Sequence, residues 1–283
     1  MRPDGTRAKN LSAIVQAIPH IMPKRYDAQN WSSEQVDDDI LRTYIREKRK
    51  EDKTVTRMSI LAAAYYKAVL ENPQLNRFVM NRKIYDRNHF CFSFVILKTR
   101  ADGTPDETTL KVFLRPEDTI FTISEKMKKM IAENQVSSHD NNTDKFANFA
   151  FSIPGLARLV FALAYCLDQW GLLPRKIIDL SPFHTSLFIT NLASINTPTI
   201  HHHCYEFGTT SVFICMGRPA RKGNGDNGKH MPISVVMDER IATGVEYSRF
   251  FAAFLRYLRN PAVLEERLDG IGEKEEESCL VEA

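Results

Sequence analysis

The chain has 283 residues, of which 43% are apolar and 26% are charged, as is typical of a globular protein with one large domain or two small ones. Its 38 Lys and Arg side chains nearly balance 35 Asp and Glu side chains, so the charge does not indicate nucleic-acid binding. Five scattered cysteines indicate free thiols in a reducing compartment. The first residues are not followed by the apolar stretch of a secretory signal, so we expect a cytoplasmic protein.

The first part of the chain predicts two helices after an irregular start. Residues 1–30 contain Pro19 and Pro23 and have a mixed polar content, so we expect irregular structure there. A helix is predicted over residues 34–50, because acidic residues near its start and basic residues near its end complement the helix dipole. Thr56 is the expected cap of a second helix, which ends near Leu70 and is apolar on almost every face, so that burial is predicted.

A β-hairpin and a third helix follow. Apolar residues alternate in 89–98 and again in 109–115, and an Asp-Gly pair between these stretches marks the turn. Apolar residues then recur at helical spacing over residues 120–131, which predicts a helix. The next stretch, residues 133–145, is polar and is expected to be an exposed loop.

An apolar, helical segment near residues 147–180 stands out from its surroundings. Arg158 and Asp168 interrupt it, and its longest uncharged run is far shorter than the roughly 20 residues that cross a bilayer. No membrane span is therefore predicted. Association with a membrane surface or another subunit stays open, but a packed helix pair accounts for the pattern better.

Three strands and one helix complete the predicted elements. The helix is the clearest, because its apolar residues form one stripe from Tyr247 to Leu258 and Asn260-Pro261 ends it. Strands and helices that alternate, with a hairpin included, predict one α/β domain with a mixed sheet. The strands are expected at residues 185–190, 210–216 and 233–238.

Gly223-Asn-Gly-Asp-Asn-Gly228 fits the G-x-G-x-x-G template of dinucleotide-binding sites. That function requires the loop to leave a strand and to open a helix, whose amides then hold the pyrophosphate. Here the loop joins two predicted strands, so we interpret it as a hairpin turn.

Three consecutive histidines, His201 to His203, invite a metal-site interpretation. On an extended segment His201 and His203 point the same way and could share an ion. Only Cys204 and Glu206 lie near enough in sequence to support them, so no metal is predicted. A segment that lines a site is the favoured interpretation.

The segment around residues 238–244 predicts a rigid turn, because a strand ends at Asp238 and an amphipathic helix starts directly after Gly244. Side chains on such a turn can be held firmly in place. A plain strand–helix connection fits this segment equally well.

These residues resemble the D-H-R-x-x-D-G motif of the catalytic domain of 2-oxoacid dehydrogenase acyltransferases, a family related to chloramphenicol acetyltransferase. Asp238, Arg240 and Gly244 match the motif, and Tyr257-Leu-Arg-Asn-Pro261 matches the end of the helix that follows it. Residues 187–192 resemble the family's T-F-T-I-S-N-L strand, and residues 71–77 match a helix end that reads P-x-L-N.

The resemblance extends over residues 15–265, and the apolar segment near 147–180 is interpreted as an insertion. It implies a two-layer α/β sandwich with a mixed sheet, as in chloramphenicol acetyltransferase. Residues 1–14 are then an N-terminal arm, and residues 266–283 are an acidic tail expected to be disordered. The family also implies a homotrimer with active sites between subunits, and coenzyme A as a substrate rather than a permanently bound cofactor.

The resemblance also assigns roles to single residues. Glu239 stands where the family has its catalytic histidine, and Thr243 stands where it has the motif aspartate. Thr190 corresponds to a serine that hydrogen-bonds the tetrahedral oxyanion, and it keeps the hydroxyl donor. His184, or one of the histidines 201–203, is an alternative source of the missing imidazole. The substrate is expected to contact Asn191, His201 and His203.

The change from His to Glu leaves two functions open. An ordinary Glu carboxyl has a pKa of about 4.3 and His of about 6.5, against about 8.5 for a thiol, so Glu is the poorer base unless burial raises its pKa. The favoured hypothesis is an acyltransferase that moves an acyl group between coenzyme A and a thiol or other acceptor. The alternative is a catalytically inactive, trimeric binding or assembly scaffold.

Overall fold

The computed structural model describes residues 2–99, 103–136, 152–221 and 228–270. Their centre is a mixed sheet in which the pairs β5–β7 and β7–β8 are parallel and the other neighbours antiparallel. The predicted mixed sheet is thus confirmed. The strand order is β2 (Gln29–Asp37), β10 (Lys229–Asp238), β8 (Val212–Met216), β7 (Leu187–Asn191), β5 (Phe90–Thr99) and β6 (Pro105–Leu114), and β9 (Ala220–Arg221) pairs with β10.

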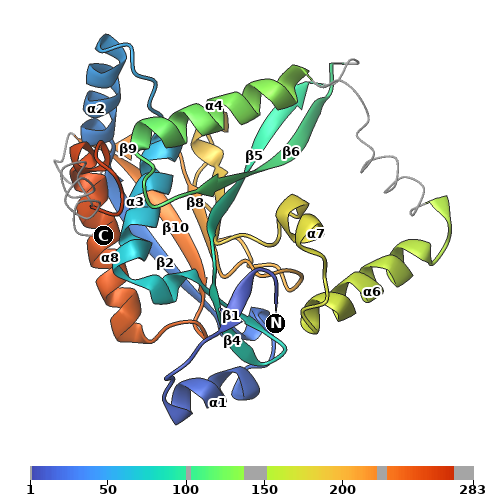
Figure 1. Cartoon of the computed structure of the whole chain (residues 1–283). Helices are drawn as coiled ribbons and strands as arrows, with labels where there is room; N and C mark the ends of the chain where they lie inside the picture. The colour runs from blue at the N-terminus through green and yellow to red at the C-terminus, as the bar shows by residue number, and fades with distance from the viewer. Residues whose placement is uncertain (1, 100–102, 137–151, 222–227, 271–283) are drawn as a thin grey trace, which may run out of the picture.

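Helices cover one face of this sheet and make the second layer of a two-layer sandwich, as predicted (Figure 1). Side chains that alternate along the strands, such as Phe92, Ile189 and Val235, point into this layer and join one apolar core. The covering helices are α2 (Asp38–Lys50), α3 (Arg57–Glu71), α4 (Ile120–Val136) and α8 (Gly244–Arg259).

Helix α3 lies in the middle of the helical layer. Thr56 caps it as predicted, since its side chain accepts a hydrogen bond from the Ser59 amide at 3.1 Å and the Ser59 hydroxyl accepts one from the Thr56 amide. Tyr65 on α3 packs edge-to-face against Phe250 and Phe254 of α8, with ring centres 4.9 and 5.9 Å apart. The apolar faces of α3 therefore contact helices on its sides as well as the sheet beneath.

Two expectations for the N-terminal part are wrong. Residues 1–30 contain β1 (Gly5–Arg7), α1 (Ala13–Ile21) and the start of β2, and residues 34–37, predicted as helix, continue β2. β2 is an edge strand with one mostly polar face, so its sequence lacks the apolar alternation that marks a strand. Asp37 then caps α2, accepting hydrogen bonds from the amides of Asp39 and Ile40 at 2.9 and 3.2 Å.

A small antiparallel sheet with the order β1-β4-β3 was also not predicted. β3 (Arg77–Met80) and β4 (Lys83–Arg87) form a tight hairpin in which Asn81 and Arg82 both have positive φ angles. β1 pairs with β4, so residues 5–7 of the expected N-terminal arm belong to this sheet.

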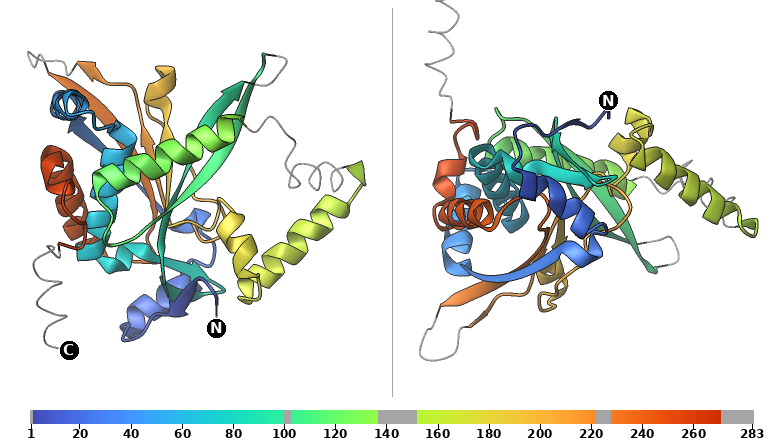
Figure 2. Two further views of the ribbon diagram at one scale, coloured as in Figure 1. Left: turned by 45° about the horizontal axis from the view of Figure 1, so that its top comes forward. Right: turned by 90° about the horizontal axis from the view of Figure 1, so that it is seen from below.

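The apolar segment forms α6 (Leu156–Gln169) and α7 (Arg175–Leu180), and α6 extends away from the sheet (Figure 2). Leu159 and Leu163 on α6 are 66% and 58% exposed, so this face of the helix is not covered by the other described elements. None of the helices within the described ranges is long and apolar enough to cross a membrane. Residues 223–227 of the predicted turn lie outside the described residues, as do the parts of the predicted loop after residue 136 and of the predicted tail after residue 270. Within the described part of that tail, Leu268 is buried, so the predicted disorder does not begin at residue 266.

Replacement of Phe254 by Ala tests the aromatic contact between α3 and α8. Because Phe254 is fully buried, the variant is expected to lower the free energy of unfolding by about 3–5 kcal/mol, measured by urea denaturation. The matched control is Val245→Ala on the exposed face of α8, with an expected loss of no more than about 0.5 kcal/mol. Equal losses for the two variants would contradict this packing.

Candidate functional site

The turn after β10 is built around the buried carboxylate of Asp238. Arg240 donates to it from Nε at 2.8 Å and from Nη2 at 2.7 Å, and Arg25 donates from Nε at 3.4 Å. Burial acts to lower the pKa of Arg240, but the hydrogen bonds and charge of Asp238 outweigh it and raise that pKa. Tyr247 of α8 donates to the Asp238 carbonyl at 2.6 Å. This charge cluster joins the strand, the turn and the helix.

Glu239 follows directly and is half-buried. Its amide donates to the carbonyl of Ala28 at 2.8 Å, so its backbone is fixed. Among the described residues, its carboxylate has no hydrogen-bond or ion-pair partner. A fixed backbone with an unengaged carboxylate leaves this group available to a ligand.

Thr243 is the cap of α8. Its hydroxyl accepts a hydrogen bond from the Glu246 amide at 3.4 Å, and the Glu246 carboxylate accepts one from the Thr243 amide at 2.6 Å. Gly244 is the first residue of the helix. Thr243, which stands where the resembled family has the motif aspartate, therefore caps helix α8 in this chain.

Thr190 lies on β7, on the sheet face opposite the helices. It pairs with Cys215, which pairs with Ser234 of β10, and Glu239 lies five residues beyond Ser234. Strand spacing of about 4.8 Å and a rise of about 3.3 Å per residue place Thr190 and Glu239 roughly 20 Å apart in one chain. They cannot touch one substrate atom within a single subunit.

Residues 197–209, called the covering segment below, cross this same face of the sheet. The Thr199 hydroxyl donates to the Cys215 carbonyl at 3.1 Å, and the ring of His202 stacks on Phe213 at 4.4 Å. The covering segment passes very close to the end of β8. A Cβ at Gly217 would lie 2.3 Å from the Thr199 nitrogen, so only glycine fits at this position.

His201 and His203 are both exposed on the covering segment, on either side of the inward-facing His202. His201 Nε2 lies 3.2 Å from the Ser32 carbonyl and from the Ser33 hydroxyl of β2. Within the described ranges, no group of three or more metal-ligating side chains occurs. Cys204 is not a reactive thiol, because burial raises its pKa to about 12.

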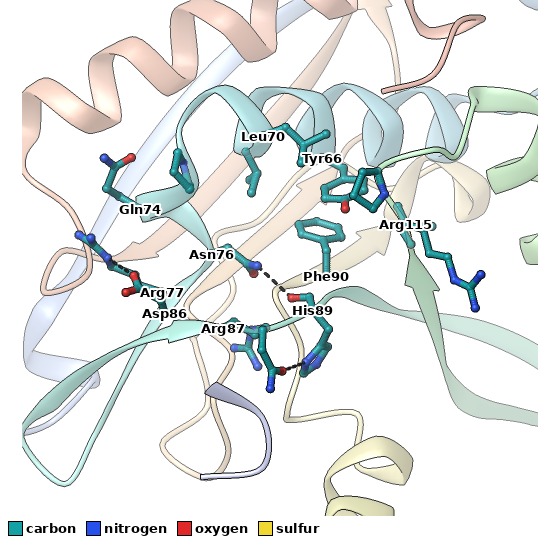
Figure 3. A pocket seen from close by; sticks show the side chains of 15 residues that line it. Tyr66, Leu70, Gln74, Asn76, Arg77, Asp86, Arg87, His89, Phe90 and Arg115 are labelled. Atoms are coloured by element: carbon teal, nitrogen blue, oxygen red, sulfur yellow. Dashed lines mark hydrogen bonds and ion pairs between the residues drawn. The ribbon is translucent and has the colours of Figure 1, made fainter. Parts of the chain in front are cut away.

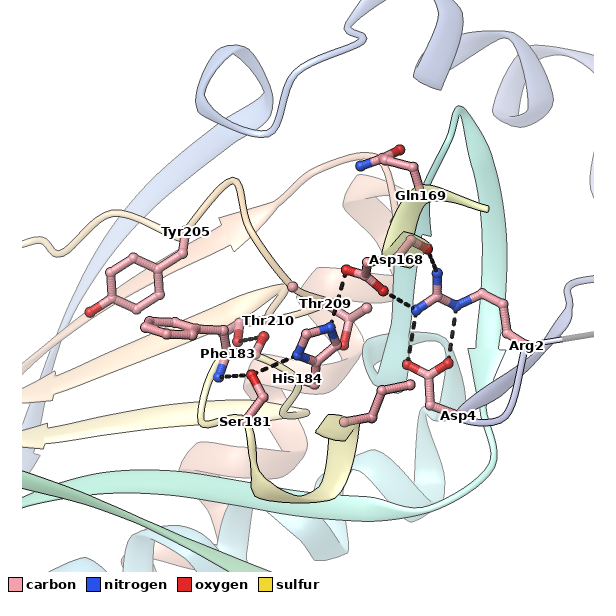
Figure 4. Close-up of polar contacts among 12 residues, drawn as sticks. Arg2, Asp4, Asp168, Gln169, Ser181, Phe183, His184, Tyr205, Thr209 and Thr210 are labelled. Carbon is pink, nitrogen blue, oxygen red and sulfur yellow. Dashed lines mark hydrogen bonds and ion pairs between the residues drawn. The ribbon is translucent and has the colours of Figure 1, made fainter. Parts of the chain in front are cut away.

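His184 is fully buried in a chain of polar contacts (Figure 4). Its Nδ1 lies 2.8 Å from the Ser181 hydroxyl and its Nε2 lies 3.1 Å from Asp168, which also binds Arg2 at 2.8 Å; Arg2 in turn binds Asp4 at 3.0 Å. Both ring nitrogens are therefore engaged, and neither faces a ligand in this conformation. The chain of contacts anchors the end of α6 to the start of the protein.

Sequence reasoning did not identify the basic residues that hold the irregular chain onto this face. Lys111 of β6 donates from Nζ to the carbonyls of Ile178, Ser181 and His184 at 2.8, 3.2 and 2.7 Å. In the sequence it occupies a polar position of an alternating strand, which normally indicates solvent exposure. Only its partners, about 70 residues away in sequence, show its role.

A separate cavity of ≈ 660 Å³ lies between the end of α3 and the start of β5, and Figure 3 shows the side chains that line it. None of the predicted site residues line it. The structure therefore does not gather Glu239, Thr190, Asn191 and the histidines around one cavity of a single chain.

No protein-family model and no curated protein sequence matches the chain. The fold is similar to those of many solved structures, and three of them illustrate the similarity. A truncated catalytic core of the 2-oxoacid dehydrogenase multienzyme complex from Thermoplasma acidophilum has a TM-score of 0.56 and 14% identity, over 90% of this chain and 99% of that one. A probable dihydrolipoamide acetyltransferase from Listeria monocytogenes 4b F2365 has a TM-score of 0.54 and 14% identity, over 89% of this chain and 94% of that one. A chloramphenicol acetyltransferase has a TM-score of 0.56 and 10% identity, over 90% of this chain and 99% of that one.

These similarities confirm the expected fold over nearly the whole chain. At 10–14% identity they establish the architecture and not the reaction. Any function must therefore be argued from the residues of the site itself.

The buried network of Asp168 generates a pH-dependent prediction. Burial acts to raise the pKa of this carboxyl, but the hydrogen bonds and charges of His184 and Arg2 outweigh it, so the pKa lies below its ordinary 3.8. The network therefore stabilises the fold above about pH 4 and loses this contribution as the pH falls through the lowered pKa. Asp168→Asn is expected to cost about 3 kcal/mol at pH 7 and clearly less at pH 3, measured by urea denaturation.

The control for this prediction is Asp179→Asn. Asp179 binds Arg175 at 2.7 Å on the surface, so its replacement is expected to cost no more than about 0.5 kcal/mol at either pH. A loss at Asp168 that does not change between pH 7 and pH 3 would contradict the proposed linkage.

Proposed function

We propose that this protein is an acyltransferase that moves an acyl group between coenzyme A and a thiol or other acceptor. Glu239 is the general base that takes the acceptor proton, and Thr190 donates a hydrogen bond to the tetrahedral oxyanion. The observation that supports this best is the free carboxylate of Glu239 on a backbone fixed by Asp238 and its two arginines. The acyltransferase fold of the similar structures supports it further.

The distance between Glu239 and Thr190 in one chain requires that two subunits share each site. Thr190 lies near the carboxyl end of β7 and Glu239 directly follows the carboxyl end of β10, and these two strands run in opposite directions. The two residues therefore lie toward opposite ends of the sheet, and a head-to-tail contact can bring Glu239 of one subunit beside Thr190 of the next. Contacts of this kind form a ring when the rotation between neighbouring subunits closes. We propose a ring of three subunits, because the acyltransferase family that residues 238–244 resemble implies a homotrimer.

The uncovered apolar surface of α6 supports an assembly of this kind. A helix of 14 residues is marginal in water by itself, and most helical stability in proteins comes from a packed apolar face. Leu159 and Leu163 lack such packing within the described part of the chain. A neighbouring subunit would supply it.

A trimeric scaffold without activity is the second candidate. Two observations favour it: a carboxylate replaces the expected imidazole, and Thr243 serves as a helix cap where the motif has its aspartate. The kinetic experiment below separates the candidates, since a scaffold gives no turnover that depends on Glu239.

Glu239→Ala and Thr190→Val test the two proposed roles. Loss of the base is expected to lower kcat by about 10²–10⁴-fold, and loss of the oxyanion donor by about 10²–10³-fold. Turnover is measured with acetyl-CoA and dihydrolipoamide, following the new thioester by mass spectrometry. Glu47→Ala, on the exposed face of α2, is the control and should match the unmodified protein. Turnover that survives Glu239→Ala would refute the assigned base.

Mixed trimers test whether two subunits share the site. Neither single variant is active, but a subunit with Thr190→Val still supplies Glu239 to a neighbour that carries Glu239→Ala and keeps Thr190. Co-expression of equal amounts is expected to restore about a quarter of the unmodified activity, because one contact in four then joins two intact residues. Light scattering should give three times the 32.5 kDa mass of the chain. A monomer, or no recovery in mixed trimers, would contradict the shared site.

A further inference from the structure

The covering segment, residues 197–209, is anchored by hydrogen bonds near its two ends. Near its start, the Thr199 hydroxyl donates to the Cys215 carbonyl of β8 at 3.1 Å. Near its end, Arg25 donates to the Gly208 carbonyl at 3.2 Å. The stretch between these anchors has no helix or strand of its own, so its side chains decide how firmly it lies on the sheet.

The middle of the covering segment rests on the ring of His202. This ring stacks on Phe213 of β8 with the ring centres 4.4 Å and the planes 18° apart, and Phe213 stacks in turn on Phe188 of β7 at 4.7 Å. Phe188 and Phe213 belong to a small apolar cluster that also contains Cys204 and Val236. His202 is thus the third ring of a stack that covers this cluster.

One nitrogen of this ring is buried without a partner. Among the described residues, Nε2 of His202 makes no hydrogen bond. In the neutral imidazole this costs one unmade hydrogen bond. The protonated imidazole has an N–H group on both nitrogens, whichever tautomer the neutral ring adopts, so the charged form buries a donor at Nε2 that meets no acceptor.

The strands beneath His202 offer no charge that would compensate a protonated ring. Glu34 of β2 pairs with Ile233, whose side chain belongs to the helical core, so this carboxylate faces the other layer. The stretches of β7, β8 and β10 under the covering segment contain no Asp, Glu, Lys or Arg, over residues 187–191, 212–216 and 233–237.

The covering segment itself also disfavours a charge on this ring. Burial first, and the charge of His203 second, lower the pKa of His202. Glu206 accepts a hydrogen bond from the Arg25 amide at 2.9 Å, at the anchored end of the segment. The remaining titratable neighbours, Cys204 and Tyr205, are neutral because burial raises the pKa of both.

His201 shows the opposite behaviour. Its Nε2 lies 3.2 Å from the Ser32 carbonyl, which accepts from an N–H group of a neutral or a protonated ring. Protonation therefore does not weaken this contact. His203 is exposed, so its charge stays in contact with water. Of the three consecutive histidines, His202 is the one whose protonation conflicts with the folded position of the segment.

We propose that the middle of the covering segment is a cover that opens in acid. His202 takes one proton from the solvent, its ring leaves Phe213, and residues 201–204 move off the sheet while the anchors at Thr199 and Arg25 hold. No covalent bond changes. The opening uncovers the apolar cluster of the outer sheet face, beside the β7 strand that carries Thr190. This behaviour goes beyond acyl transfer and does not depend on it.

The pH range of the opening follows from the two states of the ring. In the open state His202 has the ordinary pKa of about 6.5, whereas its pKa is lower in the closed state. The open state therefore binds more protons between these two values. The closed state is fully stable above about pH 6.5 and loses stability as the pH falls below it, by up to about tenfold in the open fraction per pH unit.

The cysteines of the chain report this opening. Cys204 lies two residues from His202 and is 3% exposed, so only the open state presents its thiol to a reagent. Cys166 on α6 is exposed and serves as the reference, and Cys91 is fully buried beneath residues 184–186. Dithiodipyridine labels thiols in mildly acidic solution, and mass spectrometry of peptides gives the labelling rate of each cysteine.

The labelling rate of Cys204 relative to that of Cys166 is expected to rise by up to about tenfold between pH 6.5 and pH 5.5. This ratio removes the pH dependence of the thiols themselves, because both exposed thiols are almost fully protonated in this range. Cys91 should stay unlabelled, since the opening is local. An equal rise at Cys91 would indicate general unfolding and would overturn the proposal.

Variants assign the opening to one ring. His202→Phe keeps the stack on Phe213 but takes up no proton, so the relative rate of Cys204 should not change between pH 7.5 and pH 5.5. His203→Phe is the matched control on the same segment, and the rise should persist in it. If His202→Phe does not fold by circular dichroism, His202→Gln carries the test: it loses both the stack and the proton, so Cys204 should be labelled quickly and equally at every pH.

Two further results would overturn the proposal. One is a relative rate of Cys204 that stays constant from pH 7.5 to pH 5.5 in the unmodified protein. The other is a rise that persists in folded His202→Phe or in His202→Gln. Labelling requires no acyl-transfer activity, so this test and the kinetic test of Glu239 succeed or fail independently.

Discussion

The buried carboxylate of Asp238 is the interaction on which the proposed chemistry depends. This carboxylate neutralises Arg25, which lies shortly before β2 in the chain, and Arg240 of the turn. The backbone carbonyl of Asp238 accepts a hydrogen bond from the Tyr247 hydroxyl of α8. Two buried cations without this anion would each carry a large desolvation penalty. The direction in which Glu239 projects is thus set by charges that cannot separate without unfolding the region.

The two faces of the sheet are stabilised in different ways. The helical face is an apolar core, with α3 packed between its neighbours and the strands. The opposite face is covered by irregular chain, whose carbonyl groups need partners that no regular element supplies. Lys111 and Arg87 provide them by donating to carbonyls of residues 178–185 and 209. On this face, basic side chains thus add to a smaller apolar cluster formed by Phe188, Cys204, Phe213 and Val236.

The sequence allowed the prediction of elements whose pattern is local. The hairpin β5–β6, the strands β7, β8 and β10, and helices α3 and α8 were expected near their observed positions, because apolar periodicity and caps mark them. β2 was missed, since an edge strand with one polar face looks like a helix start. The same limit applies to the candidate site: Glu239 was proposed from its motif, but the roles of Arg25 and Lys111 depend on partners far away in sequence.

The attachment of α6 has a consequence for how this protein tolerates changes at its start. The helix is joined to the body through Asp168, which shares its charge between His184 and Arg2. Arg2 and Asp4 are therefore structural residues for a helix more than 150 positions away. Trimming the first four residues would leave Asp168 and His184 buried without their cation, and proteolytic cleavage would be expected first in α6 rather than at the shortened end.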